Sequence, residues 1–288
     1  MSPFLQACGA FIDAQPFEII RLSEVYCGGA IGTIERTRVS ACQNVYSVAK
    51  TFTMTALGLL FDRGLLRLDE KVCDILKDEL PGRGMDGRWR GSTVEMALTH
   101  RLGLPGGFLD IDVNKSSDFT EDFLSYLFTF PLACEPGTEA RYSDGAYYLL
   151  ARIAEKKAGM PLDSFLWRAL LTRLDFQEMA WSHCPRGHVI GATGLYVHSS
   201  DMVKLGMLYL DRGLYRGERV LSQEWVDLAV GREFALAWDD QHRIFGKGGM
   251  YGQELIIAPE QHRVVALQSY GADSRALAQW VCDYGDRP

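Results

Sequence analysis

The chain has 288 residues, of which 47% are hydrophobic and 23% are charged, a composition typical of a globular protein. It excludes intrinsic disorder, collagen and a fibrous coil. The length suffices for one large domain or two closely joined ones. The 30 Lys and Arg residues against 37 Asp and Glu residues give a net charge of −7, and no basic run is longer than Lys156-Lys157. Nucleic acid is therefore not an expected partner.

The seven cysteines are scattered, with no Cys-x-x-Cys pair and no group of Cys and His at the spacing of metal ligands. We expect them to be reduced and mostly buried. No apolar stretch reaches the roughly 18–20 residues that span a membrane. Residues 1–20 contain no Lys or Arg, which is unlike a secretory signal. Together these features predict a cytoplasmic protein with no membrane partner.

In chain order, short strands are expected first, at 17–22 and 31–39. A buried helix follows over 47–64, because its apolar residues lie nearly all round the helix axis. Residues 70–140 are rich in Gly and Pro turns and are expected to form loops, with one short helix at 93–100.

Helical spacing returns in four later segments: 146–159, 162–174, 200–213 and 222–231. Strands are then expected at 234–238, 243–250, 253–258 and 263–270, with a closing helix at 274–284. Strands at both ends thus bracket a helical middle. We predict an α+β fold in which one antiparallel sheet, built from both termini, is flanked by helices and receives a mostly helical inserted subdomain.

The domain organisation predicted from this pattern is a single catalytic domain over 1–288. Its sheet subdomain comprises 1–46 and 232–288, and its helical subdomain comprises 47–231. Clefts that bind ligands form at boundaries of this kind.

One candidate remains after a screen for known catalytic motifs. The chain lacks the zincin, nucleophile-elbow, phosphate-loop and dinucleotide-binding patterns, and its six dispersed histidines are more readily structural than catalytic. What remains is Ser47-Val48-Ala49-Lys50, at the start of the expected buried helix. Residues three apart on a helix share a face, so the Lys50 amine can reach the Ser47 hydroxyl.

The chemistry of this pair depends on its surroundings. A serine hydroxyl needs a base to remove its proton, and a lysine near its reference pKa of about 10.4 is protonated at neutral pH. Burial lowers the pKa of a lysine, and the helix N-terminus stabilises an anionic oxygen on Ser47. The structural alternative is a serine cap followed by a solvated lysine. This alternative is disfavoured because the apolar helix continues beyond Lys50, and burying a charged side chain that has no function is costly.

Further blocks occur in a defined order and spacing. They are Tyr46–Phe52, Leu59–Glu70, Leu98–Pro105, Glu135–Thr138, Tyr142–Asp144, Gly191–Tyr196, Leu221–Val226 and Lys247–Gly249. Together they resemble the serine β-lactamase and penicillin-binding-protein superfamily, in its class C-related branch of β-lactamases, D,D-peptidases and esterases.

The resemblance implies a role for each matched residue. Ser47 is the acylated nucleophile and Lys50 its proton partner. Tyr142 is the general base toward Ser47 and the general acid toward the leaving group, for which neighbouring cations must lower the pKa of its phenol. The structural alternatives are a core aromatic at Tyr142 and a solvated strand lysine at Lys247.

The substrate side of the expected site draws on the last block, Lys247–Gly249, together with residues of the Ser47 and Tyr142 blocks. The backbone N–H groups of Ser47 and Met250 would form the oxyanion hole, and Asp144, Lys247 and Gly249 would border the substrate. No metal or organic cofactor is implied. The expected partner is a small-molecule or short-peptide acyl substrate.

Two residues depart from the family pattern. Asp144 stands where an Asn is usual, and a carboxylate in contact with Lys50 would raise the pKa of that lysine, which favours Tyr142 as the base. Gly248 replaces a Thr or Ser that helps to hold a substrate carboxylate. Both departures favour ester or amide hydrolysis over the cleavage of β-lactams or D-Ala-D-Ala.

We therefore predict a cytoplasmic serine hydrolase that forms an acyl-enzyme on Ser47. One alternative is an exported β-lactamase or D-Ala-D-Ala carboxypeptidase. Another is a non-catalytic sensor module that binds a β-lactam or a peptide in the same cleft.

Overall fold

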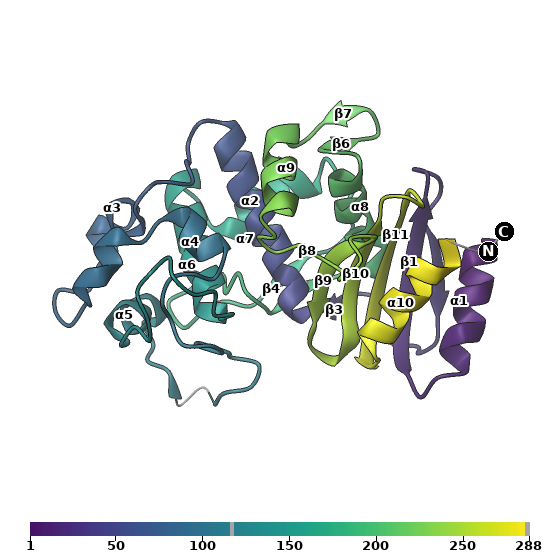
Figure 1. Ribbon diagram of the computed structural model, residues 1–288, viewed down its shortest axis with the longest axis horizontal. Helices are drawn as coiled ribbons and strands as arrows, with labels where there is room; N and C mark the ends of the chain where they lie inside the picture. The colour runs from purple at the N-terminus through teal and green to yellow at the C-terminus, as the bar shows by residue number, and fades with distance from the viewer. Residues whose placement is uncertain (116–117, 286–288) are drawn as a thin grey trace. The chain divides into compact units, whose positions relative to one another are not determined.

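Strands from both ends of the chain form one antiparallel sheet in the computed structural model, which describes residues 1–115 and 118–285 (Figure 1). The strand order is β2-β1-β11-β10-β9-β8. The bounds are β1 Glu18–Tyr26, β2 Gly32–Glu35, β8 Ala237–Trp238, β9 Phe245–Gly249, β10 Gln253–Ala258 and β11 Arg263–Gly271. The central pair joins β1 to β11, with Tyr26 opposite Arg263. The α+β fold predicted from the sequence is confirmed.

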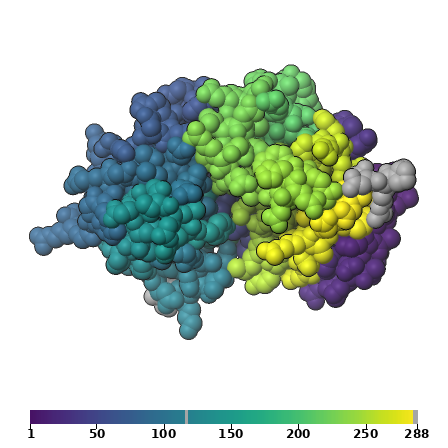
Figure 2. All heavy atoms as spheres, viewed as in Figure 1, coloured from purple at the N-terminus to yellow at the C-terminus, as the bar shows by residue number. Residues whose placement is uncertain are grey.

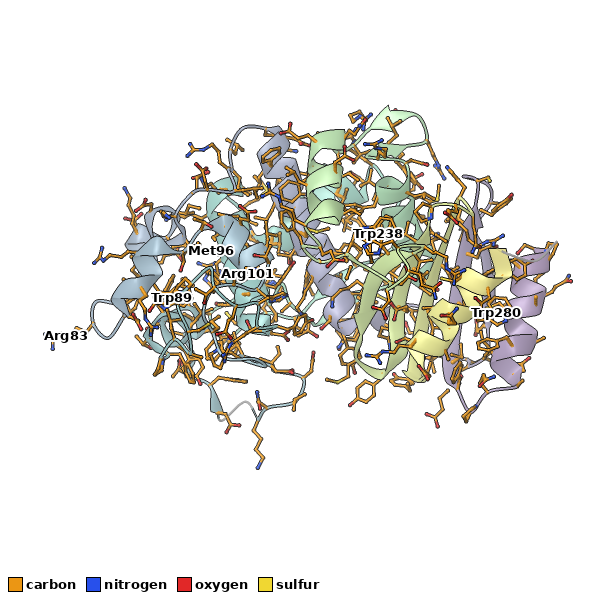
Figure 3. All side chains as sticks on the ribbon, in the orientation of Figure 1. Arg83, Trp89, Met96, Arg101, Trp238 and Trp280 are labelled. Carbon is orange, nitrogen blue, oxygen red and sulfur yellow. The ribbon has the colours of Figure 1, made fainter. Side chains whose placement is uncertain are left out.

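The terminal helices cover one face of this sheet. Helix α1 spans Pro3–Asp13 and α10 spans Ser274–Gly285. Their segments, purple and yellow in Figure 2, lie beside each other. Trp280 lies between the two helices in Figure 3 and stacks on Phe11, with ring centroids 5.3 Å apart. Apolar side chains of both helices and of alternate strand positions share one core: Phe4, Leu5, Ile12, Leu22, Ile256, Val265, Leu267, Leu277 and Val281.

Helix α8, which spans Ser199–Leu210, packs on the other face. Strand residues alternate between the two faces, so Leu255 and Val264 point away from the core that contains Ile256 and Val265. A Cβ added at Gly206 of α8 would lie 3.1 Å from the Leu255 side chain and would also meet Val264. The glycine lets the helix approach the sheet closely.

Helix α1 was not expected from the sequence, although the signals of a helix start are present. The Ser2 side chain accepts a hydrogen bond from the backbone N–H of Leu5 (3.1 Å), and Pro3 occupies the first helical turn. Serine at the cap and proline just after it are a common helix N-terminus.

The remaining short elements complete the chain. A second sheet has the order β3-β5-β4, and β6 pairs with β7 in a hairpin. Their bounds are β3 Gln43–Asn44, β4 Ala180–Trp181, β5 Leu195–Val197, β6 Leu214–Tyr215 and β7 Glu218–Arg219. Helix α9 spans Gln223–Gly231.

The middle of the chain is mostly helical. The helices are α2 Ala49–Asp62, α3 Val72–Ile75, α4 Val94–Leu98, α5 Phe123–Thr129, α6 Asp144–Ala158 and α7 Leu162–Leu166. Every residue of α2 from Ala49 to Leu60 is buried, as expected for a helix that is apolar all round. Trp89, labelled in Figure 3, packs edge-on against Phe128.

The chain divides into two compact units. The sheet unit comprises Met1–Val48, Leu171–Ala180 and Leu195–Pro288, and the helical unit comprises Ala49–Leu170 and Trp181–Gly194. These bounds differ from the expected helical subdomain 47–231, because residues 47–48, 171–180 and 195–231 belong with the sheet. The close packing of α8 on β10 and β11 accounts for the longest of these segments.

Two further expectations concern the cysteines and the membrane. All seven cysteines fall within the described residues and are free thiols, and four of them are buried: Cys8, Cys73, Cys184 and Cys282. No helix in the described part of the chain combines the length and the apolar character needed to cross a membrane.

Candidate active site

Ser47 lies on a tight turn that leads directly into α2. The chain leaves β3, bends at a 3-10 turn over Tyr46–Val48, and enters the helix at Ala49. The Asn44 side chain accepts a hydrogen bond from the backbone N–H of Tyr46 (2.9 Å), and Tyr46 has a φ of +47°. Asn side chains commonly stabilise turns of this kind. The turn places Ser47 immediately before the first turn of the buried helix.

Strand β9 passes close to this turn within the sheet unit. A Cβ at Gly249 would lie 2.6 Å from the carbonyl oxygen of Val45 and 3.3 Å from the backbone nitrogen of Ser47. The φ of Gly249 is −126°, which any residue adopts, so the glycine is needed for space alone. The fold thus brings the backbone of Ser47 next to Gly249, and Met250 is the following residue.

This close approach predicts different effects at two adjacent glycines. Gly249→Ala should destabilise the protein by about 1–3 kcal/mol, because the new methyl group meets backbone that cannot move aside. Gly248→Ala is the matched control, since its Cβ would meet the flexible end of Glu254 at 3.1 Å. Chemical denaturation measures both. Equal stability of the two variants would show that the turn at Ser47 shifts to accommodate the methyl group without a loss of stability.

Positions 247 and 248 face opposite sides of the sheet. Lys247 is paired with Leu255, on the face covered by α8, and Gly248 is paired with Glu254. Burial raises the pKa of Glu254 to about 7, against the opposing effects of the Ser274 hydrogen bond and the Lys247 charge. A hydroxyl side chain at position 248 would therefore meet a carboxyl group.

The helical unit carries the other predicted proton-transfer residues. Lys50, on the first turn of α2, is fully buried, and its Nζ donates to Asp144 Oδ1 at 2.7 Å and to the carbonyl oxygen of Ala192 at 2.9 Å. The ammonium also lies 4.8 Å from the centroid of the Tyr142 ring. The fold thus brings Lys50, Tyr142 and Asp144 together within this unit, from positions up to 94 residues apart.

The charge state of Lys50 follows from these contacts. Burial lowers the pKa of Lys50, but the carboxylate of Asp144 and the phenol of Tyr142 together raise it by more, so it lies above the ordinary 10.5. Lys50 is therefore an ammonium ion at neutral pH. The contact with Asp144 thus raises the pKa of Lys50, as expected from the sequence. Because the lysine is already protonated, it cannot accept a proton.

Tyr142 and Asp144 flank the start of α6. Ser143 caps the helix, its side chain accepting from the backbone N–H of Ala146, and the helix N-terminus stabilises the Asp144 carboxylate. Tyr142 is 45% exposed, and its ring lies 4.6 Å from the ring of His100. The His100 Nδ1 accepts from the backbone N–H of Ser143 at 3.3 Å. His100, which the sequence suggested was structural, is thus a direct neighbour of the candidate base.

Two carboxylates near Asp144 were missed from the sequence. Carboxylate oxygens of Asp110, Asp112 and Asp144 all lie within 4.8 Å of one another. Burial, followed by the charge of Asp144, raises the pKa of Asp110. Burial also raises the pKa of Asp112, which accepts a hydrogen bond from Thr193. The only sequence signal was the Asp-Ile-Asp alternation. Because the Lys50 ammonium already pairs with Asp144, this cluster has a resident cation.

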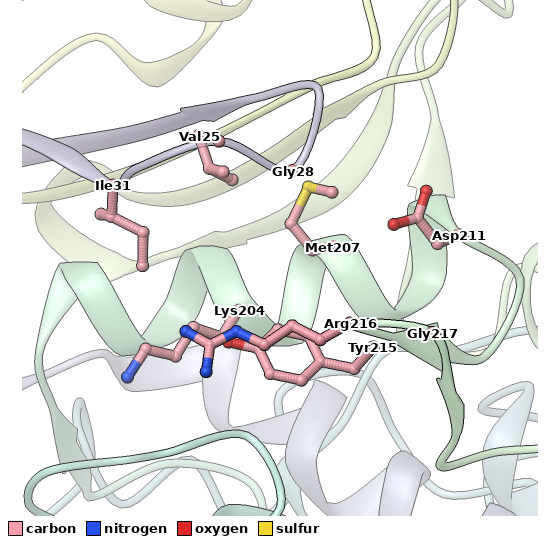
Figure 4. A pocket seen from close by; sticks show the side chains of 10 residues that line it. Val25, Gly28, Ile31, Lys204, Met207, Asp211, Tyr215, Arg216 and Gly217 are labelled. Atoms are coloured by element: carbon pink, nitrogen blue, oxygen red, sulfur yellow. The ribbon is translucent and has the colours of Figure 1, made fainter.

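The sheet unit also contains a cavity of about 200 Å³, between the β1–β2 turn and α8 (Figure 4). Met207 and Val25 line one side, and Lys204 and Tyr215 line another. The Lys204 ammonium already binds Asp201 Oδ1 at 2.6 Å. The residues that line the cavity include none of the candidate site residues of this unit, so the cavity is separate from them.

Known proteins resemble this chain in sequence and in fold. N-acetylmuramyl-L-alanine amidase of Bacillus subtilis (strain 168) is 26% identical over 81% of this chain and 67% of its own length. Penicillin-binding protein 4 of Amycolatopsis lactamdurans is 28% identical over 61% of this chain and 53% of its own length. The chain thus spans about half to two thirds of these relatives.

A solved structure shares the fold over nearly the whole chain. The structure of a penicillin-binding protein homologue from Caulobacter crescentus matches with a TM-score of 0.75 and 13% identity, over 98% of this chain and 96% of that one. The family described as Beta-lactamase matches residues 32–279, which include Ser47, Lys50, Tyr142 and Lys247. With its sheet built from both termini and its serine turn leading into a buried helix, the chain belongs to the beta-lactamase family and thereby to the hydrolases of the serine β-lactamase superfamily.

Proposed function

We propose that the protein cleaves an ester or amide bond through an acyl-enzyme on Ser47. One observation carries this proposal: a lysine with no exposed side-chain surface, ion-paired to Asp144, lies one helical turn after the serine. A buried ion pair is weak evidence for stability, because desolvation of both charges offsets their attraction. The cost of burying Lys50 is therefore better explained by chemistry than by folding.

The proposed reaction assigns one role to each residue. Ser47 Oγ forms a bond to the substrate carbonyl carbon as Tyr142 accepts the hydroxyl proton. Tyr142 then donates that proton to the leaving alcohol or amine as the bond to it breaks. Water hydrolyses the resulting ester, which releases a carboxylic acid and restores the Ser47 hydroxyl.

The role of Lys50 in this scheme is electrostatic. An ammonium held 4.8 Å from the Tyr142 ring centroid favours the phenolate form of that tyrosine. The raised pKa of Lys50 supports the assignment, because the lysine stays charged throughout. The backbone N–H groups of Ser47 and Met250 are the proposed donors to the oxyanion, and Lys247 and Gly249 border the substrate.

Two features support an ester or amide substrate over a β-lactam. Asp144 is an acceptor-only carboxylate engaged with Lys50, so it has no amide N–H to donate to a substrate carbonyl. Gly248 offers no hydroxyl to a substrate carboxylate. The name of the Bacillus subtilis relative, an amidase, supports amide chemistry as one form of the proposal.

The proposed partner is a small-molecule or short-peptide acyl substrate, met in the cytoplasm. The net charge of −7 supports the expectation that nucleic acid is not a partner. The free cysteines support a reducing compartment. We propose that residues 1–288 act as one catalytic domain, because the short segment from Ser47 to Lys50 carries residues of both units.

Mass spectrometry after mixing with a fluorophosphonate, a short-chain aryl ester and a cephalosporin tests the proposal. We expect stoichiometric fluorophosphonate labelling at Ser47 and rapid turnover of the ester, with slow or no turnover of the cephalosporin. Fast cephalosporin turnover would instead identify a β-lactamase. A stable cephalosporin adduct without turnover of the ester would identify a sensor, no label on any serine would identify a binding module, and either result would overturn the proposal.

A further inference from the structure

Three side chains with metal-ligand atoms meet beside the small sheet β3-β5-β4. They are Cys42, Glu178 and His198, all in the sheet unit, and one ligand atom of each lies within 4.8 Å of the other two. His198 Nε2 and Glu178 Oε2 are 3.2 Å apart. The three residues are too far apart in the sequence to form a metal-binding pattern, and the fold brings them together.

The backbone of the sheet fixes two of them as neighbours. In the antiparallel pair of β3 and β5, Gln43 lies opposite Val197. Cys42 and His198 are the next positions along the same ladder, one just before β3 and the other just after β5. Directly opposite side chains leave the same face of a sheet with Cβ atoms about 5 Å apart. The thiol and the imidazole are thus placed together by strand register.

Glu178 enters from the strand on the other side of β5. It lies two residues before β4, and its side chain is 63% exposed, whereas that of His198 is 18% exposed. His198 occupies the cap position of α8, but its side chain makes no capping hydrogen bond. The ring is directed to the carboxylate instead. The cluster therefore has a fixed inner side and a side open to solvent.

The electrostatic surroundings favour a cation at this place. Burial raises the pKa of the Cys42 thiol to about 11, with the carboxylates of Glu178 and Asp201 as further causes. The negative potential that opposes a thiolate attracts a divalent metal ion, and a bound metal ion reverses the balance by displacing the thiol proton.

We propose that Cys42, Glu178 and His198 bind a zinc ion through sulfur, oxygen and nitrogen. Zinc accepts these three donor types, at about 2.3 Å to sulfur and about 2.0–2.2 Å to nitrogen and oxygen, in tetrahedral geometry. Such bonds place a nitrogen and an oxygen ligand about 3.3 Å apart, close to the 3.2 Å between His198 and Glu178. Water completes the fourth position.

When the metal ion binds, it replaces the thiol proton of Cys42. The Cys42 S–H bond breaks, the proton leaves to water, and sulfur bonds to the metal ion, so no oxidant or reductant is needed. The site joins the segment that enters the Ser47 turn to the start of α8. This role is structural and does not depend on the proposed hydrolase chemistry.

The test is a titration of the full chain with Co²⁺, a spectroscopic substitute for Zn²⁺, after treatment with a chelator. We expect one equivalent to bind, with a thiolate-to-cobalt charge-transfer band in the near ultraviolet, and Zn²⁺ to remove the band. Cys42→Ser should abolish the band. Cys27→Ser is the matched control, because Cys27 is an exposed thiol of the same unit and should leave the band unchanged.

A second variant keeps the test decisive if Cys42→Ser fails to fold. His198→Gln removes no cap bond and should weaken Co²⁺ binding by at least about tenfold. Zn²⁺ should raise the Tm of the parent and not that of His198→Gln, because a ligand stabilises the state that binds it. Absence of a charge-transfer band in the parent, or a parent-like Co²⁺ affinity in His198→Gln, would overturn the proposal and leave a simple hydrogen bond between His198 and Glu178.

Discussion

Ser47→Ala should abolish turnover of a short-chain aryl ester while the fold stays intact. The variant lacks the oxygen that forms the acyl-enzyme, and the loss of a catalytic serine typically lowers kcat by about 10⁴-fold or more. Initial rates at saturating substrate measure the effect. The Tm, measured in parallel, should show that the variant still folds.

Ser200→Ala provides the matched control for this experiment. Ser200 is a half-buried serine of the sheet unit that belongs to none of the proposed catalytic groups. Its replacement should leave both the rate and the fluorophosphonate label unchanged. Parent-like rates in Ser47→Ala would show that another residue is the nucleophile.

Lys50→Met should have the largest effect on stability and should also abolish activity. The substitution keeps much of the side-chain volume but leaves the buried Asp144 carboxylate without its cation. Removing one partner of a buried ion pair typically costs about 3–5 kcal/mol. Urea denaturation measures this loss. The rate should fall because Tyr142, the proposed base, loses the positive charge beside its ring.

The double variant Lys50→Met/Asp144→Asn separates the two effects. With the carboxylate also neutralised, most of the lost stability should return, but activity should not. Alkaline pH gives an independent check on the parent. Because the folded-state pKa of Lys50 lies above the ordinary 10.5, its contribution to stability is present below that value and is lost as the pH rises past it. Lys50→Met should lack this alkaline decline, and an unchanged decline would assign it to other groups.

Elements whose pattern is local were predictable from the sequence. Helix α2 is apolar all round and begins beside Ser47, and β10 spans the expected 253–258. Helix α1 was not predicted, because its N-terminal cap was the main indication of a helix in that part of the sequence. The expected strand at 234–238 is reduced to Ala237–Trp238, since the preceding residues continue from α9 through a turn at Glu233.

Contacts between segments that are distant in the chain were harder to predict from the sequence. The motif order identified Lys50 and Tyr142, but the ion pair of Lys50 with Asp144 depends on how α2 packs against α6. Asp110 and Asp112 lie in a loop with no periodic signal. The cluster of Cys42, Glu178 and His198 arises from strand pairing, which a one-dimensional pattern of ligand spacing does not contain.

The pairing of β1 with β11 also sets the order of events during synthesis. At a ribosomal rate of about 5–20 residues per second, β1 waits on the order of ten to fifty seconds for its partner strand to be made. Over that time the edge of β1 that pairs with β11 in the folded protein is exposed. Chaperones recognise exposed segments of this kind. The turn that carries Ser47 likewise lacks β9 against it until Gly249 has emerged. The proposed activity of Ser47 therefore requires the last strands of the sheet, which are also the last to be synthesised.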